Sequence, residues 1–284
     1  MKYTKENPLR VFTAFSGYDS QILAIERLKK QFPDFDYTLV GWSEIDKYAI
    51  IAHDALFPDD KDKNFGDICK IDWAKVPDFD LFTYSWPCTD ISVAGRQEGF
   101  AKGSGTRSSL LWECERAIQI KRPKYLLMEN VKALVHEKNR KLFKEWLFFL
   151  DKLGYENFLP PEFPTPWKGR GAHTALYTIN AADMGVPQNH ERVFLVSILR
   201  TEEDPNPKYY FPEPFPLEKK LKDVLEEHVD EKYYLSDKML EYFQSVNDDD
   251  SHGHDFNPKT EDDDTAFTIR TKPGQRVDDN FFME

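Results

Sequence analysis

The sequence predicts an α/β protein with a mostly parallel, twisted sheet and helices on both faces. Two observations support this prediction. Short apolar, β-rich runs alternate with segments of helical periodicity over roughly the first 200 residues, and several of these runs end in a glycine or polar turn. The 284 residues suffice for one large domain and a smaller one. We place the boundary near residue 203, where the sequence becomes proline-rich and charged, and predict domains at 1–203 and 204–284.

The first predicted unit is a strand, a glycine turn and a helix. Residues 9–15 form the strand, Gly17 lies in the turn, and Ile22, Ile25 and Leu28 recur at one-turn spacing in the helix. Similar patterns predict the other elements in chain order. Further strands are expected at 37–43, 79–85, 125–128, 175–180 and 193–199, and further helices at 47–56, 108–120, 142–150 and 221–227.

Composition excludes several classes of protein. Hydrophobic residues make up 40% and charged residues 31%, which is ordinary for a globular protein. No apolar run approaches the roughly 20 residues of a spanning helix, and the first residues have no signal-peptide pattern, so we expect a cytoplasmic protein without membrane contact. Cys69, Cys88 and Cys114 form neither an even disulfide set nor a CxxC metal spacing, and no metal site is predicted.

The net charge of -12 argues against a nucleic-acid partner, because Lys and Arg side chains supply most of such affinity. Its distribution weakens that objection. Much of the acid lies in one tract, residues 247–264, which is typical of a solvated loop or a disordered stretch. The charge of the whole chain is therefore a poor guide to the charge of a site.

Ligands of open α/β sheets bind outside the carboxyl ends of the strands, and one cysteine follows such an end. Cys88 lies in a polar turn after the strand 79–85, where neighbouring amides and cations favour the thiolate of a nucleophile. Cys114 lies on an apolar helix face and is predicted to be core, and Cys69 is predicted to be partly buried beside Ile68. The glycine-rich stretch after Cys88 carries Arg96, Lys102 and Arg107, which suits either a loop that closes over a polyanion or a plain surface loop.

Three further acidic residues are candidates for a site at strand ends. Glu44 and Asp67 suit either the hydroxyl groups of a ribose or the capping of a helix. Glu129, after the strand 125–128, suits either a proton donor or a cap. The Gly17 turn is weak support for nucleotide binding when taken alone, and the polar run 185–192 marks the start of a strand.

Together these segments resemble the ordered motifs of the cytosine-5 DNA methyltransferases of bacterial or phage modification type. The Phe-Ser-Gly turn, the Pro-Cys turn, Glu-Asn-Val and the Gln-x-x-x-Arg run occur in the family's order over roughly residues 9–200. The resemblance implies a Rossmann-like S-adenosylmethionine-dependent methyltransferase fold in 1–203. It makes 204–284 the start of a partial target-recognition region.

The resemblance implies a covalent reaction on a cytosine that is flipped out of double-stranded DNA. Cys88 matches the nucleophile that adds to carbon 6, Glu129 the acid that protonates or hydrogen-bonds N3, and Arg192 the arginine that holds the base and this acid. The implied substrate-binding residues are Ser85, Asn130, Gln188, Arg96 and Arg107.

The same resemblance implies S-adenosyl-L-methionine as methyl donor and S-adenosyl-L-homocysteine as product. Glu44 matches the acceptor of the ribose hydroxyls, Ile45 packs on the adenine, and Asp67 with Ile68 fixes the adenine edge. The complete implied cofactor set is Phe15, Ser16, Gly17, Glu44, Ile45, Asp67, Ile68, Pro87 and Leu110.

The sequence departs from the family pattern at three places. Asp19 stands where the family has a second glycine and is predicted to cap the next helix, and His190 stands where the family has an arginine. The last two family motifs are not found. We therefore expect either a truncated chain or one half of a split enzyme that needs a second chain, and a cognate restriction endonuclease is a further candidate partner.

Three alternatives stay open at this point. The first is a methyltransferase that acts on cytosine in RNA, since one branch of the family modifies tRNA. The second is a DNA-binding or partner subunit that is inactive alone. The third is a nucleotide-binding oxidoreductase, which lacks its full GxGxxG fingerprint here and gives Pro87 and Cys88 no role.

Overall fold

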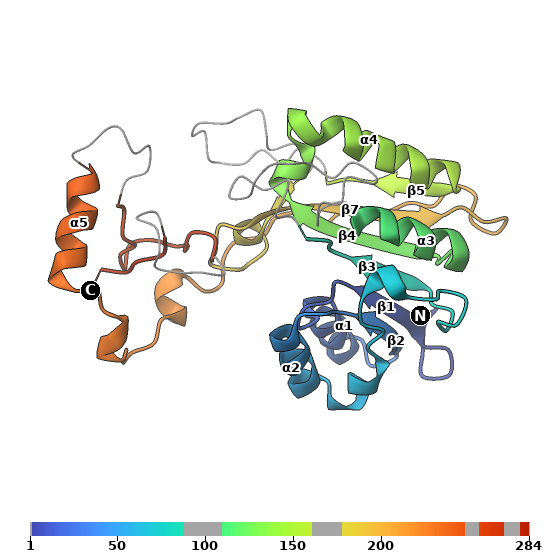
Figure 1. Ribbon diagram of the computed structural model, residues 1–284, viewed down its shortest axis with the longest axis horizontal. Coiled ribbons are helices and arrows are strands. Elements are labelled where there is room, and N and C mark those ends of the chain that lie inside the picture. Colours follow the sequence, from blue (N-terminus) through green and yellow to red (C-terminus); the bar gives the residue numbers. More distant parts are fainter. Residues whose placement is uncertain (1, 88–109, 161–177, 248–255, 270–278, 284) are drawn as a thin grey trace. The chain divides into compact units, whose positions relative to one another are not determined.

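A computed structural model describes residues 2–87, 110–160, 178–247, 256–269 and 279–283 (Figure 1). The chain forms two compact units. The first contains Met1–Thr178 and Arg192–Phe211, and the second contains Ile179–Glu191 and Pro212–Glu284. No helix of the described residues is long and apolar enough to cross a membrane. The target-recognition role of the C-terminal region and the cytoplasmic location stay predictions.

The first unit is built on the predicted mostly parallel sheet. The sheet has seven strands in the order β2-β1-β3-β4-β7-β5, and the short β6 pairs with β7. β1, β2, β3 and β4 are parallel, whereas β7 runs antiparallel to both β4 and β5. The strands are β1 (Leu9–Ala14), β2 (Tyr37–Ser43), β3 (Leu81–Tyr84), β4 (Tyr125–Val131), β5 (Tyr155–Phe158), β6 (Thr178–Asn180) and β7 (Glu191–Leu199). The sequence-based α/β prediction is confirmed.

Helices cover both faces of this sheet because successive strand residues point to opposite sides. Val11 packs with Ile22 and Ile25 of one helix, while the adjacent Phe12 belongs to the core on the other face. The helices of the first unit are α1 (Ser20–Gln31), α2 (Lys47–Leu56), α3 (Leu111–Lys121) and α4 (Glu137–Lys152), joined in places by the short 3-10 turns η1 (Pro58–Lys63), η2 (Ile68–Lys70) and η4 (Lys132–Val135). α4 starts five residues before the predicted helix. The prediction missed the first turn because its residues are entirely polar and show no apolar periodicity.

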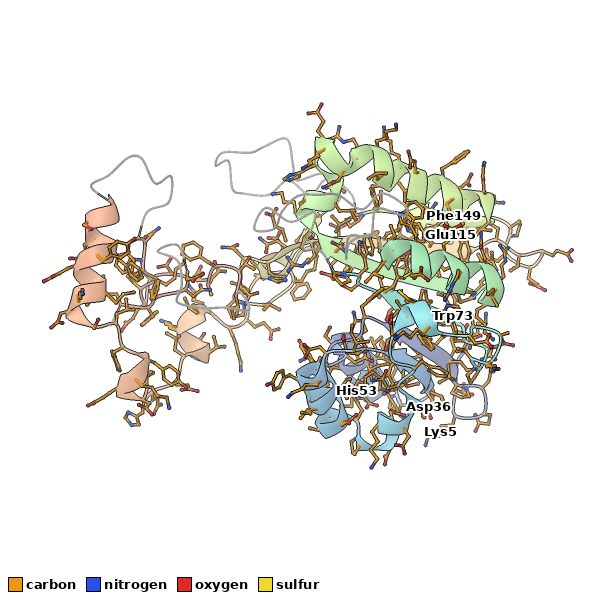
Figure 2. All side chains as sticks on the ribbon, in the orientation of Figure 1. Lys5, Asp36, His53, Trp73, Glu115 and Phe149 are labelled. Atoms are coloured by element: carbon orange, nitrogen blue, oxygen red, sulfur yellow. The ribbon has the colours of Figure 1, made fainter. Side chains whose placement is uncertain are left out.

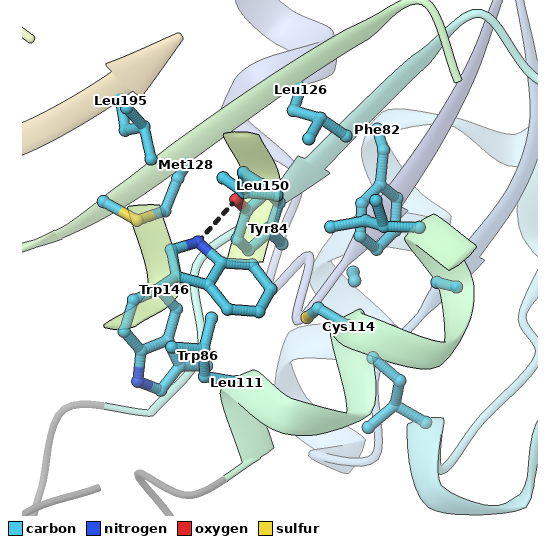
Figure 3. Packing of buried hydrophobic residues seen from close by; sticks show 14 of the residues in the cluster. Phe82, Tyr84, Trp86, Leu111, Cys114, Leu126, Met128, Trp146, Leu150 and Leu195 are labelled. Atoms are coloured by element: carbon cyan, nitrogen blue, oxygen red, sulfur yellow. Dashed lines mark hydrogen bonds between the residues drawn. The ribbon is translucent and has the colours of Figure 1, made fainter. Parts of the chain in front are cut away.

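The larger core lies between the sheet and the helices α3 and α4 (Figure 3). Tyr84 and Trp146 are fully buried there, and the indole Nε1 donates a hydrogen bond of 3.2 Å to the Tyr84 hydroxyl. Cys114 is also fully buried, as predicted, and burial raises the pKa of its thiol well above the ordinary value. Cys69, in contrast, is exposed. The prediction of its partial burial is wrong because in η2 the neighbouring Ile68 takes the inward position.

The second unit contains the 3-10 turns η5 (Ala181–Asp183), η6 (Leu221–Val224) and η7 (Glu231–Tyr233) and the helix α5 (Asp237–Asn247). The predicted helix at 221–227 is only the four-residue turn η6. Leu221 is buried, but Val224 and Leu225, which would continue its helical stripe, are 53% and 39% exposed. α5 was not predicted. Its Phe243 packs against Phe256 and Phe281, with ring centroids 5.4 and 5.2 Å away, so aromatic contacts distant in sequence stabilise this helix.

The acidic tract predicted as a solvated or disordered stretch is partly ordered. Lys259 lies 2.9 Å from Asp263 and Lys220 lies 2.7 Å from Asp264. The Lys259 ammonium and the Thr260 amide hold the pKa of Asp263 below its ordinary value. Residues 256–264 form a loop in which Glu261, Asp262 and Asp264 are exposed, which agrees with the predicted solvated loop, while residues 248–255 lie outside the described residues.

Candidate active site

The carboxyl ends of β3 and β4 meet the beginning of β7 at one edge of the sheet, because β7 is antiparallel to β4. Ser85 follows β3, Glu129 lies near the end of β4, and Arg192 lies near the start of β7. The register pairs Val131 of β4 with Arg192. Three residues that are distant in sequence are thus brought to the edge where open α/β sheets bind their ligands.

The Glu129 carboxylate is held by side chains from the other two segments. The Ser85 hydroxyl donates a short hydrogen bond to Oε2. The Arg192 Nε lies 2.8 Å from Oε1, and each side chain of this pair is 25% exposed. Each carboxylate oxygen accepts one such contact and retains further acceptor capacity. We call Ser85, Glu129 and Arg192 the carboxylate site.

Asn130 faces away from Glu129 and anchors the segment that follows β3. Its side-chain amide is buried and donates a 3.0 Å hydrogen bond to the Trp86 carbonyl, while its Oδ1 accepts from the Val131 amide at 2.9 Å. The residue predicted to bind substrate therefore fixes the backbone two positions before Cys88. Cys88 itself lies outside the described residues, as do Arg96 and Arg107.

The turn after β1 is tied to the end of β2. Phe15 and Gly17 adopt left-handed backbone angles with φ of 55° and 58°, and the Ser16 amide donates to the Ser43 carbonyl at 3.2 Å. The Gly17 amide donates to Glu44 Oε2 at 3.0 Å. The other oxygen of Glu44 accepts from the amides of Ile45 and Asp46 at 2.7 and 2.8 Å. These bonds fix the position of the Glu44 carboxylate beside the glycine turn.

Asp19 caps α1 as predicted, and it is fully buried. Its carboxylate accepts from the Ile22 amide at 3.4 Å and from the Thr13 hydroxyl at 2.6 Å. Asp19 has a φ of 67°, a left-handed conformation that glycine adopts freely and aspartate tolerates better than most residues. The backbone geometry thus accounts for a glycine or an aspartate at this position.

Sequence reasoning missed the partner of Asp19 on α2. His53, labelled in Figure 2, is fully buried, and its Nε2 lies 3.6 Å from Asp19 Oδ2. The imidazole stacks on Trp42 with ring centroids 3.7 Å apart. Nothing in the spacing of Asp19 and His53 signals this contact, because it arises only when α2 packs on β2.

The other predicted site residues differ in their exposure and in the groups that they contact. Asp67 accepts from the Cys69 amide at 3.0 Å and caps η2, and this amide lowers the pKa of its carboxyl. Ile68 is only 3% exposed and packs in the core, whereas Ile45 is 72% exposed. Phe15, Pro87 and Leu110 are partly buried, and Ser16 is buried. Gln188 lies in the second unit, where it bridges with Ala266.

The turn and strand ends of β1 and β2 suit an adenosine-like group. A Cβ placed on Gly17 or on Gly66 would meet no atom within 4 Å, so both backbones border open space. The exposed Ile45 offers an apolar surface to a base, and Glu44 offers carboxylate oxygens to hydroxyl groups. Among the described residues, no group of three His, Cys, Asp or Glu side chains could hold a metal ion.

The mostly parallel sheet with its antiparallel β7 and its polar groups at the carboxyl edge agrees with the predicted Rossmann-like methyltransferase fold. The Dnmt2 methyltransferase of S. pombe superimposes with a TM-score of 0.61 and 16% identity over 91% of this chain and 70% of that chain. The methyltransferase EhMeth of Entamoeba histolytica gives a TM-score of 0.65 and 16% identity over 92% of this chain and 70% of that one.

The chain belongs to the C-5 cytosine-specific DNA methylases, whose family model matches residues 9–276. A type II methyltransferase of Lactococcus lactis subsp. cremoris, M2.ScrFI, is 38% identical over 82% of this chain and 71% of that protein. A second one, M1.ScrFI, is 36% identical over 86% of this chain but only 54% of its own length. The orphan methyltransferase M.SssI of Spiroplasma monobiae is 31% identical over 84% of this chain and 70% of that protein.

Proposed function

We propose that this chain performs the reaction of its family on double-stranded DNA, with Cys88 as the nucleophile and the carboxylate site as the holder of the target cytosine. The observation that supports this proposal is the Glu129 carboxylate, which Ser85 and Arg192 hold from two other segments at the carboxyl edge of the sheet. A target cytosine must leave the duplex to reach such a site.

The carboxylate site matches the Watson–Crick edge of cytosine. That edge presents N3 as acceptor beside the N4 amine as donor. A protonated Glu129 carboxyl offers the complementary pair, since one oxygen donates its proton to N3 and the other accepts from N4. Arg192 fixes the carboxyl through Nε. The site therefore selects cytosine over thymine, which bears a proton at N3.

Proton donation at N3 supports attack by Cys88. The thiolate forms a bond to carbon 6, the carbon 5–carbon 6 double bond breaks, and its electron pair is delocalised toward N3, where Glu129 supplies a proton. Carbon 5 becomes nucleophilic as a result. After methyl transfer to carbon 5, a base accepts the carbon 5 proton, the carbon 5–carbon 6 double bond forms again, the Cys88 thiolate leaves carbon 6, and the N3 proton returns to Glu129. Asn130 positions the backbone from which Cys88 extends.

The cofactor expected for this reaction is S-adenosyl-L-methionine, whose sulfonium makes its methyl group electrophilic. We propose that Phe15 and Gly17 border it, that Glu44 accepts its ribose hydroxyls and that Ile45 packs on its adenine. The open space at Gly17 and the exposure of Ile45 support this assignment. In this proposal Asp67 and Ile68 act mainly through their backbone, because one side chain caps η2 and the other is buried.

Covalent trapping tests the nucleophile. A duplex with 5-fluorocytosine in the target site should form a stable adduct with the wild-type protein and cofactor, because fluorine blocks loss from carbon 5. Cys88→Ser should form none, and Cys69→Ser, at an exposed thiol, is the matched control that should still trap. An adduct with Cys88→Ser would show that another residue attacks. Methyl transfer to tRNA and not to duplex DNA would show that the substrate is RNA.

We further propose two protein partners. M2.ScrFI and M1.ScrFI carry the name of type II methyltransferases, and by this likeness we expect a restriction endonuclease with the same target sequence. A second chain with the remaining family motifs is the other candidate. Sedimentation of this chain with the product of the neighbouring gene should show a complex, and the mixture should transfer methyl groups faster than this chain alone. An unchanged sedimenting mass and an unchanged activity would contradict the second-chain proposal.

A further inference from the structure

The segment after β4 concentrates positive charge in a chain whose net charge is -12. η4 and the first half of α4, residues 132–145, contain five cations and only two carboxylates. The cations are Lys132, Lys138, Arg140, Lys141 and Lys144, and the carboxylates are Glu137 and Glu145. The local charge thus has the opposite sign to that of the whole protein.

Three of these cations share the outward face of α4. Arg140, Lys141 and Lys144 are exposed, whereas Phe143 and Trp146 are buried against the core. The spacings of three and four residues bring the three side chains together on a helix. They extend over roughly 6 Å of helix rise from first to last. We call Arg140, Lys141 and Lys144 the α4 cationic face.

The α4 cationic face forms no ion pair with any described residue, unlike most other arginines and several lysines of the first unit. Arg10 lies 2.8 Å from Asp80, Lys29 lies 2.6 Å from Asp36, and Arg200 lies 2.7 Å from Asp151. Since no described carboxylate forms an ion pair with Arg140, Lys141 or Lys144, these cations are available to an anion outside the chain.

α4 begins at the end of the sheet where the carboxylate site lies. Lys132 follows Glu129 by three residues, and η4 leads directly into α4 (Figure 1). Asn139 of α4 stabilises the junction between η4 and α4. Its amide donates to the His136 carbonyl at 3.0 Å, and its buried side chain donates to the Ala133 carbonyl at 2.9 Å. The first half of α4 is thus fixed at the same end of the sheet as Glu129.

We propose that the α4 cationic face binds the phosphate backbone of the DNA duplex that carries the target cytosine. The inference rests on the proposed function and adds a DNA-binding surface within the first unit. Arg and Lys side chains neutralise phosphates without reading sequence, so this surface contributes affinity and orientation on any duplex. In a chain of net charge -12, a local basic surface is needed to overcome the repulsion between protein and DNA.

Salt-dependent binding of an unmethylated 20-base-pair duplex that contains the target site tests this surface. The triple variant Arg140→Ala, Lys141→Ala, Lys144→Ala should bind at least tenfold more weakly at about 0.1 M salt, and the slope of log K against log salt should fall by about two to three, near 0.9 for each lost phosphate contact. The triple variant Arg140→Lys, Lys141→Arg, Lys144→Arg keeps the charges and should keep the slope.

The matched control removes the same charges from the far ends of other elements. Arg27→Ala, Lys30→Ala and Lys61→Ala replace one exposed arginine and two exposed lysines in the last part of α1 and in η1. This variant has the same net charge as the α4 variant and should bind DNA like the wild type. Equal thermal unfolding temperatures of both triple variants would show that the binding loss is not a folding defect.

Three outcomes would overturn the inference. Equal salt slopes for the two alanine triples would show that α4 does not contact phosphates, while wild-type binding and 5-fluorocytosine trapping would leave the proposed function standing. A loss of binding to tRNA without a loss for duplex DNA would assign the face to RNA. Failure of the wild type itself to bind or trap the duplex would reject the proposed function, and with it this surface.

Discussion

Among the arginine–carboxylate pairs of the first unit, two lie at opposite edges of its sheet. Arg10 pairs with Asp80 where β1 and β3 begin, and Arg192 pairs with Glu129 where β4 ends. The carboxylate side chains are similarly exposed, 21% for Asp80 and 25% for Glu129, so exposure does not distinguish them. The two carboxylates differ in which residues donate hydrogen bonds to them.

Asp80 is bound on both oxygens by one residue. The Arg10 guanidinium donates to Oδ1 at 2.8 Å and to Oδ2 at 3.0 Å, and the Arg10 amide also donates to Oδ2. Glu129 receives one contact from Ser85 and one from Arg192. The first arrangement saturates a carboxylate and joins two strands. The second positions a carboxylate and leaves acceptor capacity for a ligand, and this difference separates a structural pair from a binding group.

Glu129→Gln should produce the largest effect. The amide oxygen still accepts from Arg192, but the side chain can no longer deliver a proton to N3. We expect kcat/KM for methyl transfer to fall by about 10² to 10⁴, the usual contribution of a general acid. Transfer of a labelled methyl group to duplex DNA measures this. The variant's unfolding free energy should stay within about 1 kcal/mol of the wild type, and a loss of activity below tenfold would remove Glu129 from the reaction.

Arg192→Lys should have a smaller effect on the same reaction. Lysine keeps the positive charge but loses the planar guanidinium that fixes the carboxylate. The loss of one charged hydrogen bond corresponds to about 1.5 to 3 kcal/mol, or roughly 10- to 150-fold in kcat/KM. The matched Arg10→Lys substitution at the other edge should leave kcat/KM unchanged. Equal losses in both variants would mean that the two pairs do not differ in function.

Asp80→Asn should have the smallest effect, and it should act on stability alone. We expect a loss of about 1 kcal/mol in unfolding free energy, because the pair is partly exposed and screened. Burial alone raises the pKa of Asp80, but the Arg10 guanidinium and amide outweigh it, so the pKa in the folded protein lies below the ordinary value.

The depressed pKa gives this contribution a definite pH dependence. It is present above the unfolded pKa of about 3.9 and is lost as the pH falls through the lower folded pKa. Chemical denaturation of wild type and Asp80→Asn should show a constant difference between pH 5 and 8 that shrinks below about pH 4. If the difference in unfolding free energy between wild type and Asp80→Asn grew in acid, or if Asp80→Asn transferred methyl groups more slowly, a purely structural role of Asp80 would be contradicted.

The sequence predicts most of the sheet and the positions of Glu129 and Arg192, because each follows or starts an apolar strand within a specific motif. The α1 cap was predicted for the same reason, since Asp19 directly precedes a helical pattern. Local signals of this kind extend over a few residues. Spacing within the motifs is therefore sufficient to place these groups at one edge of the sheet.

Contacts between distant residues could not be predicted in the same way. Arg10 and Asp80 are 70 residues apart, and neither belongs to a motif. His53 meets Asp19 only because α2 packs against β2, and α5 depends on Phe256 and Phe281 from later segments. In each case tertiary packing, and not local pattern, determines the neighbour.

Side chains alternate between the two faces of β4, so the faces on which Glu129 and Asn130 lie depend on the length of this strand. Glu129 and Asn130 are adjacent and point to opposite faces, one toward Arg192 and the other toward the buried Trp86 carbonyl. Their register pairs them with Phe194 and Val193. A single-residue insertion or deletion between 125 and 128 would exchange the two faces, burying an acid and exposing the anchor. Natural variation in this strand should therefore proceed by substitution and exclude changes of length.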